Sequence, residues 1–173
     1  MYDFTNLKAG DRLLLTGTIL TARDKAHLFL LDTDFPKANS SIIYHCGPIV
    51  KDNNILAAGP TTSARMNPYT PKLIEKYDIK AIIGKGGMSK EVLAALRGRA
   101  VYFSAIGGAA SMYASKMKLK KVHKLEFGMA EAMYELEVKD FPVVVMMDSK
   151  GNSIYDDVLE ASEKVFNNLV GKI

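Results

Sequence analysis

Short apolar runs along the chain alternate with segments in which apolar residues recur at a helical spacing. The runs at 79–83, 100–105 and 143–147 are apolar without interruption, which is typical of strands covered on both faces. Residues 11–20 and 41–50 are also rich in strand-forming residues, although Gly47-Pro48 interrupts the second stretch. Two further strands are expected over 121–127 and 132–138.

Helix signals lie between these strands. Thr70-Pro71 has the pattern of an N-cap followed by proline at the first helical position, and it predicts a helix that ends at Tyr77. Ser89 is placed to cap the next helix, and Gly98 is placed to stop it. The expected helices cover 24–32, which should be buried on most sides, 70–77, 90–96, 109–116 and 156–169.

The order of these elements predicts a mixed α/β fold with layered helices. It lacks the regular long strand–helix–strand rhythm of a doubly wound nucleotide-binding fold. No repeat, low-complexity stretch or linker divides the sequence, so one domain over 1–173 is expected.

Composition narrows the class of protein further. Of 173 residues, 48% are hydrophobic and 24% are charged, which excludes a disordered chain and allows a sizeable core. The longest apolar runs fall far short of the ~20 residues that a membrane-spanning helix needs. The first residues show no basic segment followed by an apolar run, so we expect no signal peptide and a cytoplasmic protein.

Cysteine and histidine usage limits the metal chemistry. Cys46 is the single cysteine, so the chain can form neither an intrachain disulfide nor a self-contained iron–sulfur cluster, which needs about four protein ligands. The three histidines are scattered and do not match the spacing of a structural zinc site. His27, His45 and Cys46 have apolar neighbours, which favours the interpretation that they are core residues.

The formal net charge is +4, and part of the excess is gathered in one lysine-rich run. Such a run fits either an anion or nucleic-acid patch or a solvated surface. The second interpretation is favoured because no interleaved aromatic residues support RNA binding. The run consists of Lys116, Lys118, Lys120, Lys121 and Lys124.

Four segments at predicted strand-to-helix junctions combine glycines, hydroxyls and cations, and such junctions commonly carry the sites of α/β proteins. In the first, residues 21–27, Arg23 could grip an anion at the helix start. An equally good interpretation is that Asp24 caps the helix while Arg23 pairs with a surface acid. The sequence leaves these two alternatives open.

The second segment, residues 59–66, combines three consecutive hydroxyl residues with Arg65 and favours an anion site over a simple capped turn. The third, 84–89, is glycine-rich and contributes Lys85, but it matches neither the Walker A motif nor G-x-G-x-x-G. The fourth, 105–110, fits close packing as well as ligand contact. Two arginines and a lysine near helix starts point to a small substrate with two carboxylates or to a phosphorylated one.

Several of these motifs together resemble a known family. GPTTSARMNPYTP (59–71) followed by GKGGMS (84–89) resembles the beta subunit or C-terminal domain of class I fumarate hydratases. The resemblance extends through TGTILTARDKAH (16–27), IGGAA (106–110) and ELEVKDFPVVVMMDSKGNSIYDDV (135–158), and so covers about 13–158. The beta subunit of L-tartrate dehydratase has the same framework.

The resemblance implies a swivelling β/β/α domain with a mixed sheet and a hydro-lyase that interconverts fumarate and L-malate in the tricarboxylic acid cycle. It also implies a cluster-bearing alpha subunit as partner, whose [4Fe-4S] cluster would complete the active enzyme. In this sequence Arg23, Arg65 and Lys85 match the family's cationic substrate contacts. Thr61 matches the hydroxyl proposed as the catalytic base.

Two alternatives stay open beside that expectation. The substrate can be tartrate or another hydroxy-diacid, because the motif addresses the two carboxylates. The chain can also be a non-enzymatic module that uses the same loops to bind a dicarboxylate. A nucleic acid stays open as a ligand of such a module, whereas for the hydro-lyase neither a nucleic acid nor a membrane is expected as a partner.

Overall fold

The computed structural model describes residues 2–170, so Met1 and 171–173 of the expected 1–173 domain lie outside the described residues. The helices in that range are α1 (Asp24–Asp32), α2 (Thr70–Tyr77), α3 (Lys90–Leu96), α4 (Ala110–Ala114) and α5 (Ile154–Val170). The strands are β1 (Arg12–Thr21), β2 (Ile42–Tyr44), β3 (Ile49–Lys51), β4 (Asn54–Ala57), β5 (Ala81–Gly84), β6 (Val101–Ser104), β7 (Met117–His123) and β8 (Met133–Met147).

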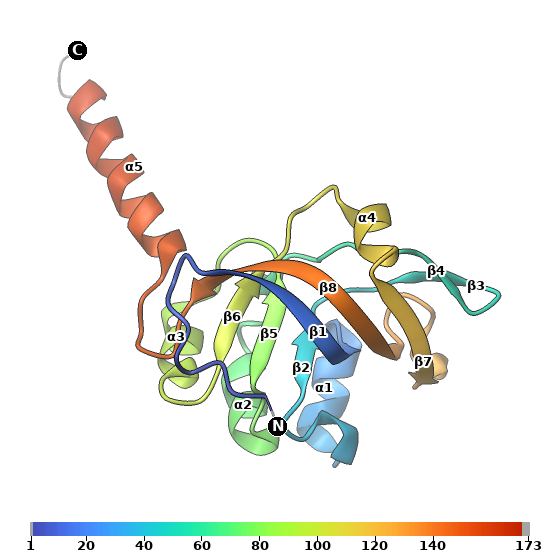
Figure 1. Ribbon diagram of the computed structural model, residues 1–173. Coiled ribbons are helices and arrows are strands. Elements are labelled where there is room, and N and C mark those ends of the chain that lie inside the picture. The colour runs from blue at the N-terminus through green and yellow to red at the C-terminus, as the bar shows by residue number, and fades with distance from the viewer. Residues whose placement is uncertain (1, 171–173) are drawn as a thin grey trace.

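The main sheet is mixed and curls back on itself. β1, β2, β5 and β6 run parallel in that order, whereas β8 runs antiparallel to β6, β7 and β1. Because β8 pairs with strands at both ends of the parallel group, β1 and β8 form a layer above β2, β5 and β6 (Figure 1). Helices α1, α2 and α3 form a third layer below the parallel strands (Figure 1).

Side chains that alternate along each strand fill the two spaces between these layers. Ile42 and Tyr44 belong to the cluster between the strand layers, whereas Ile43 belongs to the cluster that packs against the helices. Val101 and Phe103 face the first cluster in the same way, since successive strand residues point to opposite faces. The result is a β/β/α arrangement with a mixed sheet, which confirms the predicted fold class.

Most predicted elements are confirmed, and three details are corrected. The expected strands at 132–138 and 143–147 are two halves of the single strand β8. The strand expected over 121–127 is confirmed only for 121–123, because β7 ends at His123 and Lys124 adopts a left-handed φ of 55° before a short 3-10 helix. The hairpin strand β4 was not expected; it pairs with β3 through a turn at Asp52 and Asn53, whose φ values are also positive.

The helix ends and faces follow the sequence less closely. Ser89 caps α3 by accepting a hydrogen bond from the Val92 N–H at 3.5 Å, as expected. Thr70 does not cap α2, because its hydroxyl donates to the Met66 carbonyl at 2.8 Å. The helix at 24–32 is also less buried than expected, since Leu28 is exposed to solvent.

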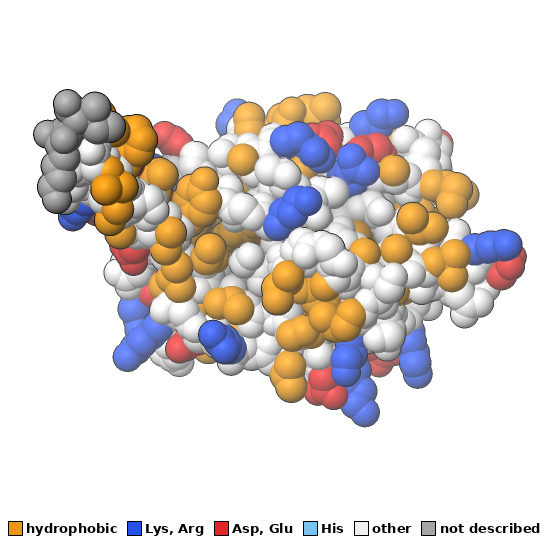
Figure 2. All heavy atoms as spheres, turned by 90° about the horizontal axis from the view of Figure 1, so that it is seen from above, with side chains coloured by type: hydrophobic (Ala, Val, Ile, Leu, Met, Phe, Trp, Pro, Cys, Tyr) orange, Lys and Arg blue, Asp and Glu red, His pale blue; other side chains and the backbone are white. Residues whose placement is uncertain are grey.

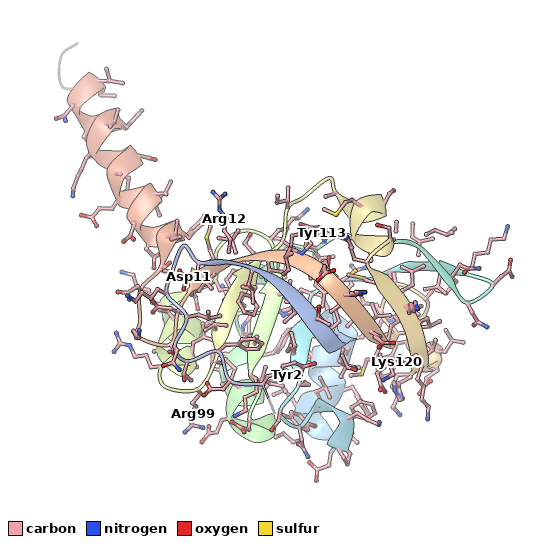
Figure 3. All side chains as sticks on the ribbon, viewed as in Figure 1. Tyr2, Asp11, Arg12, Arg99, Tyr113 and Lys120 are labelled. Carbon is pink, nitrogen blue, oxygen red and sulfur yellow. The ribbon has the colours of Figure 1, made fainter. Side chains whose placement is uncertain are left out.

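Helix α5 projects from the body of the protein instead of packing on it (Figure 1). None of its described residues is buried, and Figure 3 shows side chains that extend from it on every side with no other element beside it. Figure 2 shows apolar side chains, in orange, along this projecting helix at the left of the view. The exposed apolar residues of α5 are Tyr155, Val158, Leu159, Val165, Phe166, Leu169 and Val170.

No helix among residues 2–170 has the length and apolar character needed to cross a membrane.

Candidate functional site

The candidate site lies where the parallel strands end, because parallel strands bring their carboxyl ends to one edge of the sheet. Arg23 follows β1, His45 follows β2, and Lys85 follows β5 at this edge. The loop 59–66 crosses the same edge, since Thr62 and Lys85 form a parallel bridge. Three of the four predicted junctions therefore meet in space.

Thr61 is held against the end of β2 by its main chain and by its side chain. Its N–H donates to the His45 carbonyl at 2.7 Å, and its hydroxyl donates to the same oxygen at 3.0 Å. Its own carbonyl accepts from the Lys85 N–H at 3.3 Å. A carbonyl oxygen cannot take up the threonine proton, so in this arrangement Thr61 presents oxygen lone pairs and not an activated base.

Lys85 supplies a positive charge beside Thr61. Its side chain is half-buried, and its Nζ forms no ion pair with any residue in the described range 2–170. Gly107 follows β6, and a Cβ added there would lie 3.7 Å from Cδ of Lys85. The lysine stem thus runs across the loop after β6, which ties the fourth junction to the site.

Arg65 lies on the short 3-10 helix Ser63–Met66 and pairs with Asp24 at the start of α1. Its Nε donates to one carboxylate oxygen of Asp24 at 3.3 Å, and its Nη2 donates to the other at 3.0 Å. Burial raises the pKa of Asp24, but the hydrogen bond and charge of Arg65 outweigh burial and leave that pKa lowered. Asp24 therefore orients Arg65. It does not cap α1, which was one of the alternatives that the sequence left open.

Arg23 is held by the segment that precedes β8. Its Nη1 donates to the Ala130 carbonyl at 3.3 Å, and its Nε lies 3.4 Å from a carboxylate oxygen of Glu131. The pairing of Arg23 with an acid, one of the two open alternatives, is therefore present in the structure. It leaves the Arg23 side chain about a quarter exposed at the edge that also carries Arg65.

The capped-turn alternative for 59–66 is not what the structure contains. Neither Thr62, which precedes the 3-10 helix, nor any other hydroxyl of the triplet caps it. Thr61 bonds to the His45 carbonyl, and the Ser63 hydroxyl lies 2.9 Å from Nδ1 of His45. The hydroxyls thus connect loops at the site instead of starting a helix.

Two buried histidines pack against each other beneath these loops. The ring centroids of His27 and His45 are 5.0 Å apart in a T-shaped arrangement. Nδ1 of His27 donates to the Arg23 carbonyl at 2.8 Å, as expected for a satisfied core histidine. Nε2 of His45 is buried and has no hydrogen-bond partner among the described residues, so the core interpretation does not account for it.

Burial of these histidines predicts loss of stability in acid. Burial lowers the pKa of His27 from 6.5 to about 4, so the unfolded state binds a proton first as the pH falls. The free energy of unfolding should therefore decrease between pH 6.5 and 4, by about 3 kcal/mol for this one group. Urea unfolding at pH 7, 6, 5 and 4 measures the slope. His27→Asn should make the slope shallower, because the buried His45 still contributes to it, and an equal slope in this variant and the wild type would contradict the expectation.

The chain's own donor atoms do not fit an iron–sulfur cluster. Cys46 is its single cysteine, its side chain is buried, and burial raises the pKa of the thiol to about 12. Among residues 2–170, no three His, Cys, Asp or Glu side chains are grouped as metal ligands would be. A cluster at this site would therefore need cysteine ligands from outside these 173 residues.

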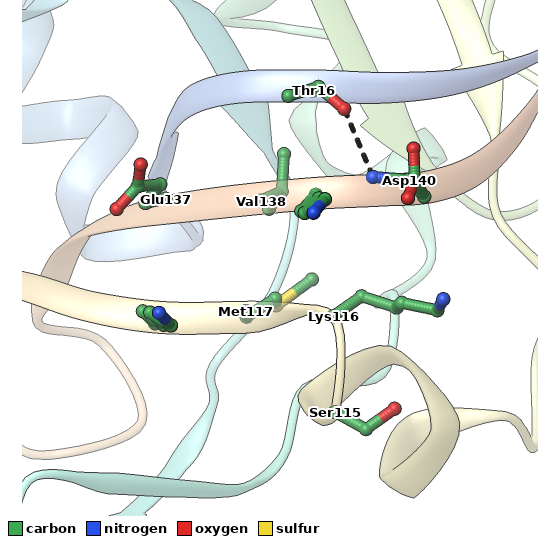
Figure 4. A pocket seen from close by; sticks show the side chains of 9 residues that line it. Thr16, Ser115, Lys116, Met117, Glu137, Val138 and Asp140 are labelled. Atoms are coloured by element: carbon green, nitrogen blue, oxygen red, sulfur yellow. Dashed lines mark hydrogen bonds between the residues drawn. The ribbon is translucent and has the colours of Figure 1, made fainter.

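The lysine-rich run lies away from this edge, on the outer strand β7. Lys118, Lys120 and Lys121 are exposed, and Lys120 lies at the rim of the molecule in Figure 3. A hollow of about 470 Å³ between β7 and β8 is lined by lysines together with Glu137 and Asp140 (Figure 4). Because both signs of charge line it, the solvated-surface interpretation fits the run better than an anion site.

Sequence reasoning singled out the four residues at the edge but missed those that support them. The sequence predicts His45 as a core residue, and it gives no signal for Tyr102, whose hydroxyl lies 3.0 Å from that of Ser63. Ser63 was noticed only as one of three adjacent hydroxyls. Asp24 was considered as a cap, and Glu131 was not considered, because its contact with Arg23 spans more than half the chain.

Comparison with known proteins adds a family match and named relatives. Residues 2–158 match the family model described as "Fumarase C-terminus". A provisionally named class I fumarate hydratase of Geobacillus stearothermophilus is 48% identical over 164 residues, which are 90% of this chain and 32% of the relative. The chain therefore spans about a third of that relative's length.

Two relatives of more similar length carry a subunit name. A provisionally named L(+)-tartrate dehydratase subunit beta of Methanocaldococcus jannaschii is 45% identical over 183 residues, with 98% of this chain and 94% of the relative covered. The L(+)-tartrate dehydratase subunit beta of Escherichia coli K12 is 35% identical over 164 residues, with 88% and 81% covered. Relatives of both names thus match 88% or more of this chain.

Proposed function

Because the chain belongs to the fumarase C-terminus family, we propose that it is the beta subunit of a hydro-lyase that interconverts fumarate and L-malate. The observation that carries this proposal is the meeting of the Arg23, Thr61, Arg65 and Lys85 loops at one edge of the sheet. Three cations at one edge match a substrate with two carboxylates better than a neutral one.

The reaction removes a proton from the carbon next to one carboxylate and hydroxide from the neighbouring carbon, which leaves a double bond. As the proton departs, electron density moves onto the adjacent carboxylate. Fixed cations at that carboxylate stabilise the transition state more than the substrate, because the negative charge there grows during the step. We assign this role to Arg65 and Lys85, and we assign binding of a carboxylate to Arg23.

Pairing with the protein's own acids leaves part of each arginine for the substrate. Asp24 occupies Nε and Nη2 of Arg65, and the Nη1 group bonds to no other residue within 2–170. The ion pair already holds the guanidinium in place, so less side-chain entropy is lost when the substrate binds. Thr61 shares the loop of Arg65 and its carbonyl accepts from the Lys85 N–H, and in this proposal its hydroxyl oxygen contacts the reacting carbon or its departing proton.

The proposal includes a partner, because the donor atoms of this chain do not fit a [4Fe-4S] cluster. We propose that an alpha subunit binds the cluster and closes over the edge that carries Arg65 and Lys85. The relatives named as beta subunits support such an arrangement. So does the G. stearothermophilus relative, in which the matched region is about a third of one longer chain.

The test of the function is an assay of the reconstituted pair. The chain is co-expressed with a cysteine-bearing partner under anaerobic conditions, and turnover of L-malate and of L-tartrate is compared. We expect kcat/KM for malate to exceed that for tartrate. A clear preference for tartrate would mean that the enzyme is a tartrate dehydratase and not a fumarate hydratase. The name of the E. coli relative favours this alternative.

A non-enzymatic dicarboxylate module is the alternative from another class. It would bind dicarboxylates by isothermal titration in the absence of any partner, and the reconstituted pair would turn over none of them.

Assembly with the partner should be visible as a change in mass. The isolated chain exposes a row of apolar residues on α5, and exposed apolar patches of this kind are typical of surfaces that another polypeptide covers. Light scattering should show self-association of the chain alone and a defined hetero-oligomer with the partner. A monomer whose mass does not change when the partner is added would contradict the two-subunit proposal.

A further inference from the structure

A continuous chain of buried polar groups lies beneath the candidate site. Nδ1 of His45 lies 2.9 Å from the Ser63 hydroxyl, which lies 3.0 Å from the Tyr102 hydroxyl. The Tyr102 hydroxyl lies 2.9 Å from the Gly86 carbonyl. His45, Ser63 and Tyr102 have no solvent exposure, so no water competes for these contacts.

The positions of the protons follow from which groups can only accept. The Tyr102 hydroxyl has one proton for two oxygen neighbours, and the Gly86 carbonyl can only accept, so we assign that proton to Gly86 and let Ser63 donate to the Tyr102 oxygen. The Ser63 oxygen is left to accept from the N–H at Nδ1 of His45. If Ser63 donated to His45 instead, the contact between the Ser63 and Tyr102 oxygens would contain no proton.

This arrangement fixes the tautomer of His45. With this assignment the proton is on Nδ1, and Nε2 carries a buried lone pair that has no partner within residues 2–170. A buried polar atom without a partner is destabilising, so the protein maintains His45 here at an energetic cost. Such a cost is typical of groups that serve a site.

The chain joins the two loops that carry the proposed substrate contacts. Ser63 belongs to the loop with Thr61 and Arg65, and Gly86 follows Lys85 directly. The His45 carbonyl also accepts both hydrogen bonds of Thr61. The loops meet so closely that a Cβ on Gly84 would overlap the Ser63 hydroxyl.

We propose that His45, Ser63 and Tyr102 are positioning residues that clamp the 59–66 loop to the 84–89 loop and so set Thr61 and Lys85 for the reaction. The proposal rests on the proposed hydro-lyase function. None of the three residues is required to touch substrate, and His45 acts as a neutral donor and not as a proton-transferring base.

The first test reads the His45 tautomer directly in the full chain. Nitrogen-15 NMR should give a protonated-type signal for Nδ1 of His45 and an unprotonated-type signal for Nε2. Ser63→Ala should move the Nδ1 signal, whereas Lys118→Ala should leave it unchanged. A proton on Nε2 would overturn the proposal, and this readout does not depend on enzyme activity.

The second test compares two tyrosines in the reconstituted enzyme. Tyr102→Phe removes the hydroxyl that donates to Gly86, and Tyr77→Phe removes a buried hydroxyl that donates to carbonyls beside α1. Displacement of reacting groups by about 1 Å can cost 10²-fold, so Tyr102→Phe should lower kcat by about 10- to 10²-fold with a smaller change in KM. Tyr77→Phe should lower the melting temperature without lowering kcat.

The third test separates positioning from base catalysis. His45→Asn can keep an N–H at the position of Nδ1, so it should retain most of the activity that His45→Leu loses. The pH dependence of kcat/KM should be the same for His45→Asn and the wild type, because a positioning histidine does not titrate in the reaction.

The outcomes distinguish this proposal from the proposed function. An unchanged kcat in Tyr102→Phe, or loss of one limb of the pH profile in His45→Asn, would overturn the positioning role while malate turnover by the wild type stands. No turnover of any dicarboxylate by the wild-type pair would overturn the proposed function, whatever tautomer His45 adopts.

Discussion

Arg65→Ala is expected to lower kcat/KM for malate by about 10²–10³-fold in the reconstituted enzyme, because it removes a preorganised donor at a carboxylate whose charge grows in the transition state. The fold should persist. Arg65 is exposed and its pair with Asp24 lies at the surface, so the change should cost within about 1 kcal/mol of stability. The measurements are steady-state kinetics and thermal melting of each variant.

Two control variants accompany Arg65→Ala. One tests whether positive charge alone suffices at position 65, and the other tests whether loss of any exposed cation has the same effect. Arg65→Lys keeps the charge but cannot form both bonds to Asp24, so it should restore only part of the activity. Lys118→Ala removes an exposed cation from β7 and should change neither kinetics nor melting. Near-wild-type turnover of Arg65→Ala, or a loss of activity explained entirely by its melting, would contradict the assignment of the site.

The isolated chain is expected to have no hydratase activity at all, which is the second large effect. Its single cysteine is buried, and burial raises the pKa of that thiol, so supplied iron and sulfide should find no cluster ligands here. Anaerobic purification of the chain alone, followed by an absorbance assay of fumarate, should show no turnover with or without iron and sulfide.

Addition of the cluster-bearing subunit is the matched positive control and should produce activity under the same conditions. Fumarate hydration by the lone chain would mean that the catalytic groups all belong to this polypeptide, and the two-subunit proposal would be wrong.

Strand signals predicted the fold where burial alone decides the structure. The apolar runs at 79–83 and 100–105 became β5 and β6 because strands covered on both faces have no polar positions. The polar pair Lys139-Asp140 concealed the continuity of β8. There Asp140 takes a φ of 52° and its N–H donates to the Thr16 hydroxyl at 3.1 Å, so a local irregularity bends the strand without ending it.

The sequence predicts the cationic residues of the candidate site but not the residues that pair with them. Arg23, Arg65 and Lys85 stand out because each lies beside a glycine, a hydroxyl or a helix start in the sequence itself. The acids that orient the arginines depend on tertiary contacts, and Asp24 is 41 residues from Arg65. Tyr102 could not be found in the same way, because its hydroxyl meets Ser63 only after β6 pairs with β5.

The pairing of β1 with β8 has a consequence for how the protein folds during synthesis. Arg12 pairs with Val144, so the layer formed by β1 and β8 joins two segments that are far apart in the sequence. Contacts between residues so distant in sequence slow folding, because the intervening chain must first be ordered. While the ribosome is still making the middle of the protein, β1 has no antiparallel partner, and its unpaired edge is open to other chains. We therefore expect this polypeptide to reach its native state only after β8 has left the ribosome, and a nascent chain truncated before Met133 to need a chaperone to stay in solution.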